Sequence, residues 1–196
     1  MKANRWMRSL LVAVCLACAG LFAISAAPSE VSAQDTDAIT MEFIGFGVNP
    51  DFYAIVQGSK LSGKSLVIYK VGGKGPSLVY PLAGVSLDKA LNSREVAPFG
   101  IQKGSGVASM TAPAGYQLGG MVIGENLQLT LSAGGQSMTL GYAQIFSNPL
   151  KTKQAQISIK GAFWTPDSKR VVIILNQKLD GDWPVDTDMV AAYTLG

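Results

Sequence analysis

The chain has 196 residues, with 16 lysines and arginines against 13 aspartates and glutamates and a formal net charge of +3. It contains no histidine, and its two cysteines, Cys15 and Cys18, both lie in an apolar stretch near the N-terminus. This composition excludes His-dependent catalytic triads and His metal ligands. Three of the 16 basic residues lie within the first eight residues, and without the N-terminal segment the chain is close to neutral. It then lacks the basic excess of a nucleic-acid binder or a polybasic membrane-surface protein, so no nucleic-acid partner is expected.

Residues 1–33 are predicted to be a secretory signal peptide. Three basic residues within the first eight precede an apolar run over residues 10–27. Val31-Ser-Ala33 then has the pattern of a cleavage site. These features predict cleavage before Gln34 and a periplasmic or secreted location.

Two alternatives stay open for this segment. One is an uncleaved anchor helix, because the apolar run approaches the ~20 residues that span a bilayer, and the other is a lipoprotein modified at Cys18. Cleavage would remove both cysteines and leave no disulfide, thiol nucleophile or membrane span in the exported chain. Residues 34–38 are then expected to be a flexible new N-terminus, and residues 39–196 a single β-rich domain.

The first part of this domain is predicted to be a series of strands. Residues 39, 41 and 43 are apolar and alternate with polar residues, as on a strand with one buried face. Asn49-Pro-Asp51 then supplies a turn, because Pro presets φ and Asp bonds the backbone that follows it. Further strands are expected at residues 52–57, 65–71 and 77–82.

Residues 58–65, Gly-Ser-Lys-Leu-Ser-Gly-Lys-Ser, match the phosphate-loop pattern G-x-x-x-x-G-K-[ST]. A nucleotide site of this kind needs a helix after the lysine, because amide groups at the helix N-terminus hold the phosphates. The residues after Lys64 predict a strand instead. We therefore expect this match to be a hairpin connection and not a nucleotide site.

One short helix is predicted over residues 86–94. Ser86 is a suitable N-cap, and Leu87 and Leu91 lie on one face at the i, i+4 spacing. Pro98 ends the segment. A helix of this length is marginal alone in water, so we expect it to be stabilised by tertiary packing.

The middle of the chain has the clearest strand pattern. Leu127, Leu129 and Leu131 alternate with polar residues, which indicates one buried and one solvated face. Gly134-Gly135 then leads into a second strand over residues 137–145. The two strands are predicted to form a hairpin.

A second strand–turn–strand unit, residues 160–176, repeats the first one, with Thr165-Pro-Asp-Ser168 as its turn. Alternation predicts a strand over residues 157–163, and residues 170–175 are apolar on both faces, as in a central strand. Residues 189–195 are predicted to be the last strand. The domain is thus expected to be mainly β, with antiparallel sheets arranged as a sandwich, a barrel or part of a propeller, and one short helix.

Four carboxylates, Asp180, Asp182, Asp186 and Asp188, lie within nine residues and are expected in a loop. Hard oxygen ligands at this density suit Ca²⁺, although the spacing is not that of an EF-hand loop. A glycosidase-like carboxylate pair is a second interpretation, and a solvated hairpin loop is a third. Trp183, in the same loop, is a candidate for an exposed aromatic contact.

The order of the first segments carries a resemblance. Phe43-Ile-Gly-Phe46 is followed by Asn49-Pro-Asp51 and then by apolar strands at residues 52–56 and 66–69. This order resembles the opening of a family of predicted secreted bacterial proteins of unknown function, which begin with a Phe-Ile-Gly-Phe-Ser-Pro-Asp-Gly type of strand, turn and strand. The unit is also similar to TolB-type β-propeller repeats. The resemblance implies export and a β-rich fold, and it implies no activity.

These patterns predict an exported binding or structural module of the bacterial cell envelope rather than an enzyme. The candidate binding residues are Asp180, Asp182, Trp183, Asp186 and Asp188, with an envelope protein or a glycan as the partner. No cofactor is expected other than Ca²⁺ at these carboxylates. The alternatives are a carboxylate-dependent hydrolase and a Ca²⁺-dependent binding module, both of which would use the segment from Asp180 to Asp188.

Overall fold

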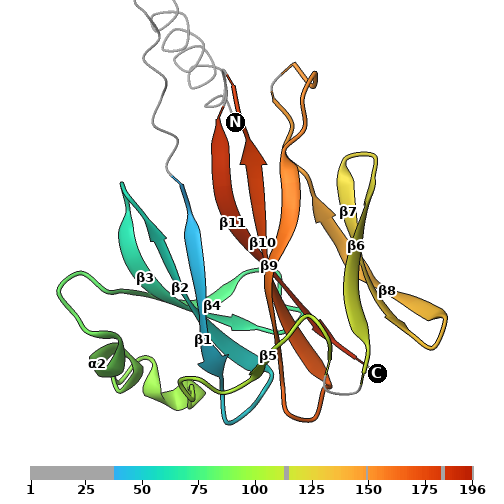
Figure 1. Cartoon of the computed structure of the whole chain (residues 1–196). Coiled ribbons are helices and arrows are strands. Elements are labelled where there is room, and N and C mark those ends of the chain that lie inside the picture. Colours follow the sequence, from blue (N-terminus) through green and yellow to red (C-terminus); the bar gives the residue numbers. More distant parts are fainter. Residues whose placement is uncertain (1–37, 113–114, 149, 182–183, 196) are drawn as a thin grey trace, which may run out of the picture. The chain divides into compact units, whose positions relative to one another are not determined.

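The computed structural model describes residues 38–112, 115–148, 150–181 and 184–195 (Figure 1). The predicted signal peptide, residues 1–33, and the predicted N-terminus of the exported chain, apart from residue 38, lie outside the described residues. The described part is mainly β and forms three antiparallel sheets, which confirms the predicted fold class. Within it, no helix is long and apolar enough to cross a membrane.

The first sheet has the strand order β1-β2-β3-β4. Its strands are β1 (Thr40–Phe46), β2 (Phe52–Ser59), β3 (Gly63–Lys70) and β4 (Pro76–Pro81). The turn between β1 and β2 forms as predicted, since Asn49 accepts hydrogen bonds from the amides of Asp51 and Phe52. Lys64, the lysine of the phosphate-loop match, lies within β3, so the helix that a nucleotide site requires is replaced by a strand.

A short helical segment covers one face of this sheet. α2 (Leu87–Leu91) begins at Ser86, whose side chain accepts a hydrogen bond from the amide of Lys89 at 3.3 Å. It is shorter than predicted, and a 3-10 helix, η1 (Ala97–Phe99), follows it. Ala90 and Val96 are fully buried against Leu66 and other residues of the sheet, so packing stabilises a helix that is too short to be stable alone.

The second sheet has the order β11-β10-β9-β5. Its strands are β5 (Val107–Ala108), β9 (Gln156–Trp164), β10 (Arg170–Leu179) and β11 (Val185–Thr194). Residues 171–175 are all buried, as the two-sided apolar pattern predicted for a central strand. Side chains of alternate residues of β10 point to opposite faces, so Ile173 and Leu175 contact one hydrophobic cluster and Val172 another.

The third sheet has the order β6-β7-β8, with β6 (Gln117–Ile123), β7 (Asn126–Ala133) and β8 (Gln136–Gln144). The predicted hairpin is β7–β8, and Leu127, Leu129 and Leu131 are its buried face. They pack in one cluster with Trp164 and with Val171, Ile173, Leu175 and Leu179 of β10. β5 and β6 are additions that the sequence pattern did not predict.

The predicted acidic loop over residues 180–188 is corrected by the structure. β11 begins at Val185, so Asp186 and Asp188 lie within a strand and not in a loop. The last strand therefore starts before the predicted residue 189. Asp188 is tolerated in a buried strand because its carboxylate has several hydrogen-bond donors around it.

Candidate functional site

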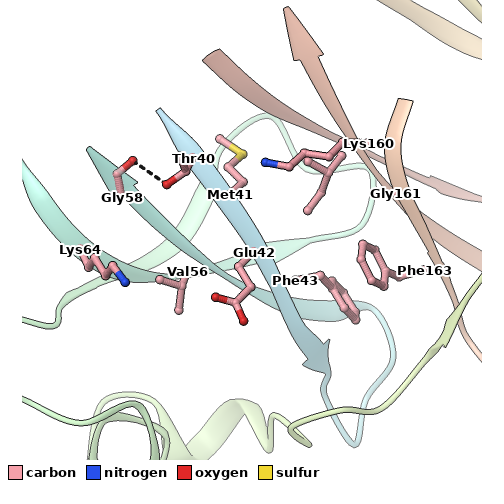
Figure 2. Close-up of a pocket in the computed structure, with 11 residues that line it drawn as sticks. Thr40, Met41, Glu42, Phe43, Val56, Gly58, Lys64, Lys160, Gly161 and Phe163 are labelled. Carbon is pink, nitrogen blue, oxygen red and sulfur yellow. Dashed lines mark hydrogen bonds between the residues drawn. The ribbon is translucent and has the colours of Figure 1, made fainter. Parts of the chain in front are cut away.

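A cavity of about 530 Å³ lies between β1 of the first sheet and β9 and β10 of the second (Figure 2). Its lining comes from five strands, three of the first sheet and two, β9 and β10, that lie about a hundred residues later in the sequence. The lining residues are Thr40, Met41, Glu42, Phe43, Val56, Gly58, Lys64, Lys160, Gly161, Phe163 and Ile174. Most are apolar, and the only charged residues among them are Glu42, Lys64 and Lys160.

Two aromatic rings form one wall of the cavity. Phe43 of β1 and Phe163 of β9 stack with ring centroids 4.3 Å apart and an interplanar angle of 17°. Phe46 packs edge-on against Phe43, with centroids 5.1 Å apart. Because Phe43 and Phe163 come from different sheets, their stacking joins the two sheets at the cavity (Figure 2).

A β-bulge sets the position of Lys160. In the pairing of β9 with β10, Ile159 pairs with Leu175 and Gly161 pairs with Ile174, so Lys160 is the extra residue. An extra residue interrupts the ladder and redirects a side chain. The side chain of Lys160 is half exposed and extends toward Met41 on β1 (Figure 2).

Asp188 holds the ammonium group of Lys160 in place. The carboxylate of Asp188 is only 1% exposed, and its Oδ2 lies 2.5 Å from Lys160 Nζ. Oδ2 also accepts a hydrogen bond from the amide of Met41 at 2.8 Å, and Oδ1 accepts one from Asn176 Nδ2 at 3.0 Å. A buried carboxylate with three donors is satisfied, and it links β1, β9, β10 and β11 beside the cavity.

The edge of β1 borders the cavity between two covered ends. At one end, Asp188 accepts the hydrogen bond of the Met41 amide. At the other end, the loop after η1 covers the edge, since Ile44 and Phe46 carbonyls accept bonds from the amides of Gly104 and Gln102. Alternate residues of a strand present their backbone groups to the same side, so the Phe43 amide faces the cavity between these ends.

The structure brings together only part of the predicted acidic site. Asn176 Nδ2 donates to both Asp186 and Asp188 at 3.0 Å, so these two carboxylates share one face of β11. Asp180 is apart from them, 84% exposed and 3.8 Å from Lys178 Nζ. Asp182 and Trp183 lie outside the described residues. Among the described residues, no group of three or more Asp, Glu, His or Cys side chains is arranged to hold a metal ion.

The sequence analysis missed Lys160 and Glu42 as site residues. A signal was present, since Gly45 and Gly161 each interrupt a strand five residues before the proline of a Pro-Asp turn. Glycine inside a strand often marks a bulge. Both bulges occur, with Ile44 as the extra residue of β1 and Lys160 as the extra residue of β9.

Comparison with known proteins finds no matching family model, no matching curated protein and no matching solved structure. The resemblance to the secreted bacterial family, carried by residues 43–56 and 66–69, therefore stays a prediction.

Proposed function

We propose that this chain is an exported binding module of the bacterial cell envelope, and that the cavity between β1 and β9 binds an amphipathic anion. The observation that carries the proposal is an apolar, aromatic cavity bordered by two lysine side chains. The exported location rests on the predicted signal peptide. The binding role rests on the geometry of the cavity.

The size and lining of the cavity fit a small ligand. Binding pockets for small molecules enclose about 300–1,000 Å³ and combine an apolar lining with a few polar groups that fix orientation. This cavity has about 530 Å³ and an apolar lining that includes Phe43, Phe163 and Ile174. An apolar or aromatic part of a ligand would pack against the stacked rings of Phe43 and Phe163.

The ammonium groups at the cavity favour an anionic group on the same ligand. Lys64 and Lys160 line the cavity together with Glu42, and the carboxylate of Asp188 is paired with Lys160 beside it, so the preference for an anion rests on the open N–H donors of the two lysines and not on a net positive charge. One N–H group of the Lys160 ammonium donates to Asp188, which holds the ammonium in place. Because the Lys160 side chain is half exposed, its other N–H groups remain open to a ligand. A carboxylate, sulfonate or phosphate at this position would add a charge-assisted hydrogen bond.

The same geometry favours binding over hydrolysis at Asp188. The carboxylate is buried and already accepts hydrogen bonds from Met41, Lys160 and Asn176. A general acid or base must reach the substrate within hydrogen-bond distance, and a nucleophile needs an accessible oxygen. Asp188 is therefore better suited to positioning Lys160 than to reacting with a substrate.

Titration with the fluorescent anion 1-anilinonaphthalene-8-sulfonate tests the binding role. We expect saturable binding that shifts the NMR amide signals of Phe43, Gly161 and Phe163. The uncharged analogue N-phenyl-1-naphthylamine should bind at least about fivefold more weakly, which corresponds to about 1 kcal/mol. Equal affinity for the two probes would rule out a role for the anionic group.

Matched variants locate the site. Lys160→Gln and Lys64→Gln should each weaken binding of the sulfonate about fivefold, with little effect on the uncharged probe. Lys169→Gln, at an exposed lysine of the turn between β9 and β10, is the control and should bind as the wild type does. Unchanged affinity in the Lys160 and Lys64 variants would contradict the proposed site. Mass spectrometry of the chain recovered from the periplasm tests export separately, with Gln34 expected as the first residue.

A further inference from the structure

β6 is a free sheet edge without the features that usually prevent association. It pairs with β7 in continuous register from Gln117 to Ile123, with no bulge. The strand contains no charged residue and no proline. Its side chains near the end are exposed, at 57% for Met121, 54% for Val122 and 46% for Ile123. Long, flat, uncharged edges present unpaired backbone groups that bind another strand.

Several other sheet edges among the described strands carry protective features. β4 begins at Pro76 and ends at Pro81, and β8 carries a bulge at Leu140, opposite Leu129 and Thr130. The edge of β1 is covered at one end by Asp188 and at the other by the loop after η1, and the edge of β11 is covered at Thr187, which bridges to Ile39. Prolines, bulges and covering segments are the known means of preventing edge pairing. In the part of the chain that the structure describes, β6 has none of them over Gly119 to Ile123.

Two features limit the free part of β6. At one end, the segment before β6 covers the edge, since the Leu118 amide donates to Met110 and the Tyr116 carbonyl accepts from Ala112. At the other end, the chain turns at Gly124, directly after Ile123. The free edge therefore runs from residue 119 to residue 123, and Met121 is its centre.

The hydrogen-bonding groups of this edge are self-complementary. Because Leu118 directs its amide away from β7, Gly120 and Val122 direct their amides and carbonyls the same way. In an antiparallel pair centred on Met121, Gly120 of one copy lies opposite Val122 of the other. Each such pair exchanges both of its hydrogen bonds, so all the outward groups of the two residues are satisfied. In this arrangement the partner strand does not reach Leu118, where the segment from Met110 to Ala112 covers the edge.

We propose that β6 pairs antiparallel with β6 of a second copy of this chain, about a two-fold axis at Met121. The two three-stranded sheets then form one continuous sheet with the order β8-β7-β6-β6-β7-β8. The arrangement is isologous and closes, so it gives a dimer rather than a fibre. The absence of charge on β6 means that no like charges oppose each other across the axis. A free edge of five residues is short, so we expect a dimer that depends on concentration.

Single cysteines test the register directly. At a non-hydrogen-bonded antiparallel pair the Cα atoms lie about 4.5 Å apart, within the range of about 4.4–6.8 Å that a disulfide needs. Met121 forms such a pair with itself across the axis, so Met121→Cys should give a covalent dimer under mild oxidation. The experiment uses the full chain with Cys15→Ser and Cys18→Ser. Val122→Cys is the control, because it is equally exposed but lies about 8 Å from its copy, since an offset of about 6.8 Å along the strand adds to the separation of about 5 Å between the strands.

Each outcome decides the proposal. A disulfide-linked dimer with Met121→Cys and little with Val122→Cys supports the register. Equal cross-linking of the two variants, or none in either, overturns it. Sedimentation of the cysteine-free chain gives a second readout, in which Met121→Lys should weaken self-association about tenfold because it places like charges opposite each other. Val79→Lys, at an exposed position of β4, should not change it.

Discussion

Arg170 joins the two Pro-Asp turns of the domain. Its Nε lies 2.9 Å and its Nη2 lies 2.7 Å from the same Oδ1 atom of Asp51. Asp51 belongs to the turn between β1 and β2, and Arg170 directly follows the turn between β9 and β10. The backbone of Arg170 is fixed as well, since its amide donates to Thr165 Oγ1 at 3.0 Å. The two similar sequence segments are therefore connected across the first and second sheets.

Replacing Arg170 with Met should lower the free energy of unfolding by about 1 kcal/mol. The Arg170 side chain is 19% exposed and Asp51 is 41% exposed, so solvent screens the pair and limits its contribution. Urea unfolding at constant m-value measures the change. Lys169→Met, at the exposed neighbouring position, is the control and should stay within about 0.5 kcal/mol of the wild type. A loss in the control equal to that in Arg170→Met would contradict the role of the ion pair.

The pair Lys160–Asp188 should show a larger coupling free energy than an exposed pair. Asp188 is buried, so replacing Lys160 leaves a buried negative charge with fewer partners, which is unfavourable. Because Lys160 is half exposed, solvent can partly replace it, and this limits the loss of stability. A double-mutant cycle with Lys160→Met and Asp188→Asn should give a coupling of about 1–2 kcal/mol. The matched control is the ion pair Lys103–Asp88, at 2.9 Å and with both side chains more than half exposed. Its coupling should be below about 0.5 kcal/mol, and equal values for the two pairs would show that burial of Asp188 has no effect.

Elements that are defined by residues close together in the sequence could be predicted from local patterns. The leucines of β7 alternate over a complete strand, and Gly134-Gly135 fixes the hairpin with β8. Ser86 and Leu87 similarly located the start of α2. β6 was missed because Gly119-Gly120 interrupts its apolar pattern, and glycine weakens any strand prediction.

The candidate site is formed by residues that are far apart in the sequence. Asp188 was predicted to lie in a loop with the three other aspartates, and a carboxylate in a buried strand is unfavourable without partners. Its partners Lys160 and Met41 lie 28 and 147 positions away, and no local pattern connects them. The cavity lining is likewise spread over β1, β2, β3, β9 and β10. The matching glycines of β1 and β9 were the available signal, and they indicate bulges rather than ligands.

Gly45→Ala should destabilise the domain by about 2–3 kcal/mol. A Cβ atom at Gly45 would lie 2.0 Å from the carbonyl oxygen of Gln102, and this backbone is tied to β1 by the hydrogen bond from the Gln102 amide to Phe46. Hydrogen exchange should also show faster exchange of the Gln102 and Gly104 amides. Gly75→Ala is the control, because a Cβ there meets no atom within 4 Å. A stability of Gly45→Ala within about 0.5 kcal/mol of this control would contradict the close approach.

The stability of the domain should fall as the pH rises above about 10, because of one buried and two partly buried tyrosines. Burial raises the pKa of Tyr53, Tyr69 and Tyr193, and the charge of Tyr69 raises the pKa of Tyr53 further. In the unfolded chain tyrosine ionises near pH 10. Above that pH the unfolded state loses protons that the folded state keeps, so the equilibrium shifts toward unfolding. Below pH 10 these groups are protonated in both states and have no such effect.

Tyr53→Phe tests the largest contribution to this alkaline effect. Tyr53 and Tyr69 stack with ring centroids 5.5 Å apart, and phenylalanine keeps the ring without the ionisable hydroxyl. The slope of the free energy of unfolding against pH between 10 and 12 should be shallower in the variant than in the wild type, after both are referred to their values at pH 7. Absorbance at 295 nm should show a fraction of the six tyrosines ionising only on unfolding. Ionisation of all six in the folded protein near pH 10, with the same slope in both proteins, would contradict the effect of burial.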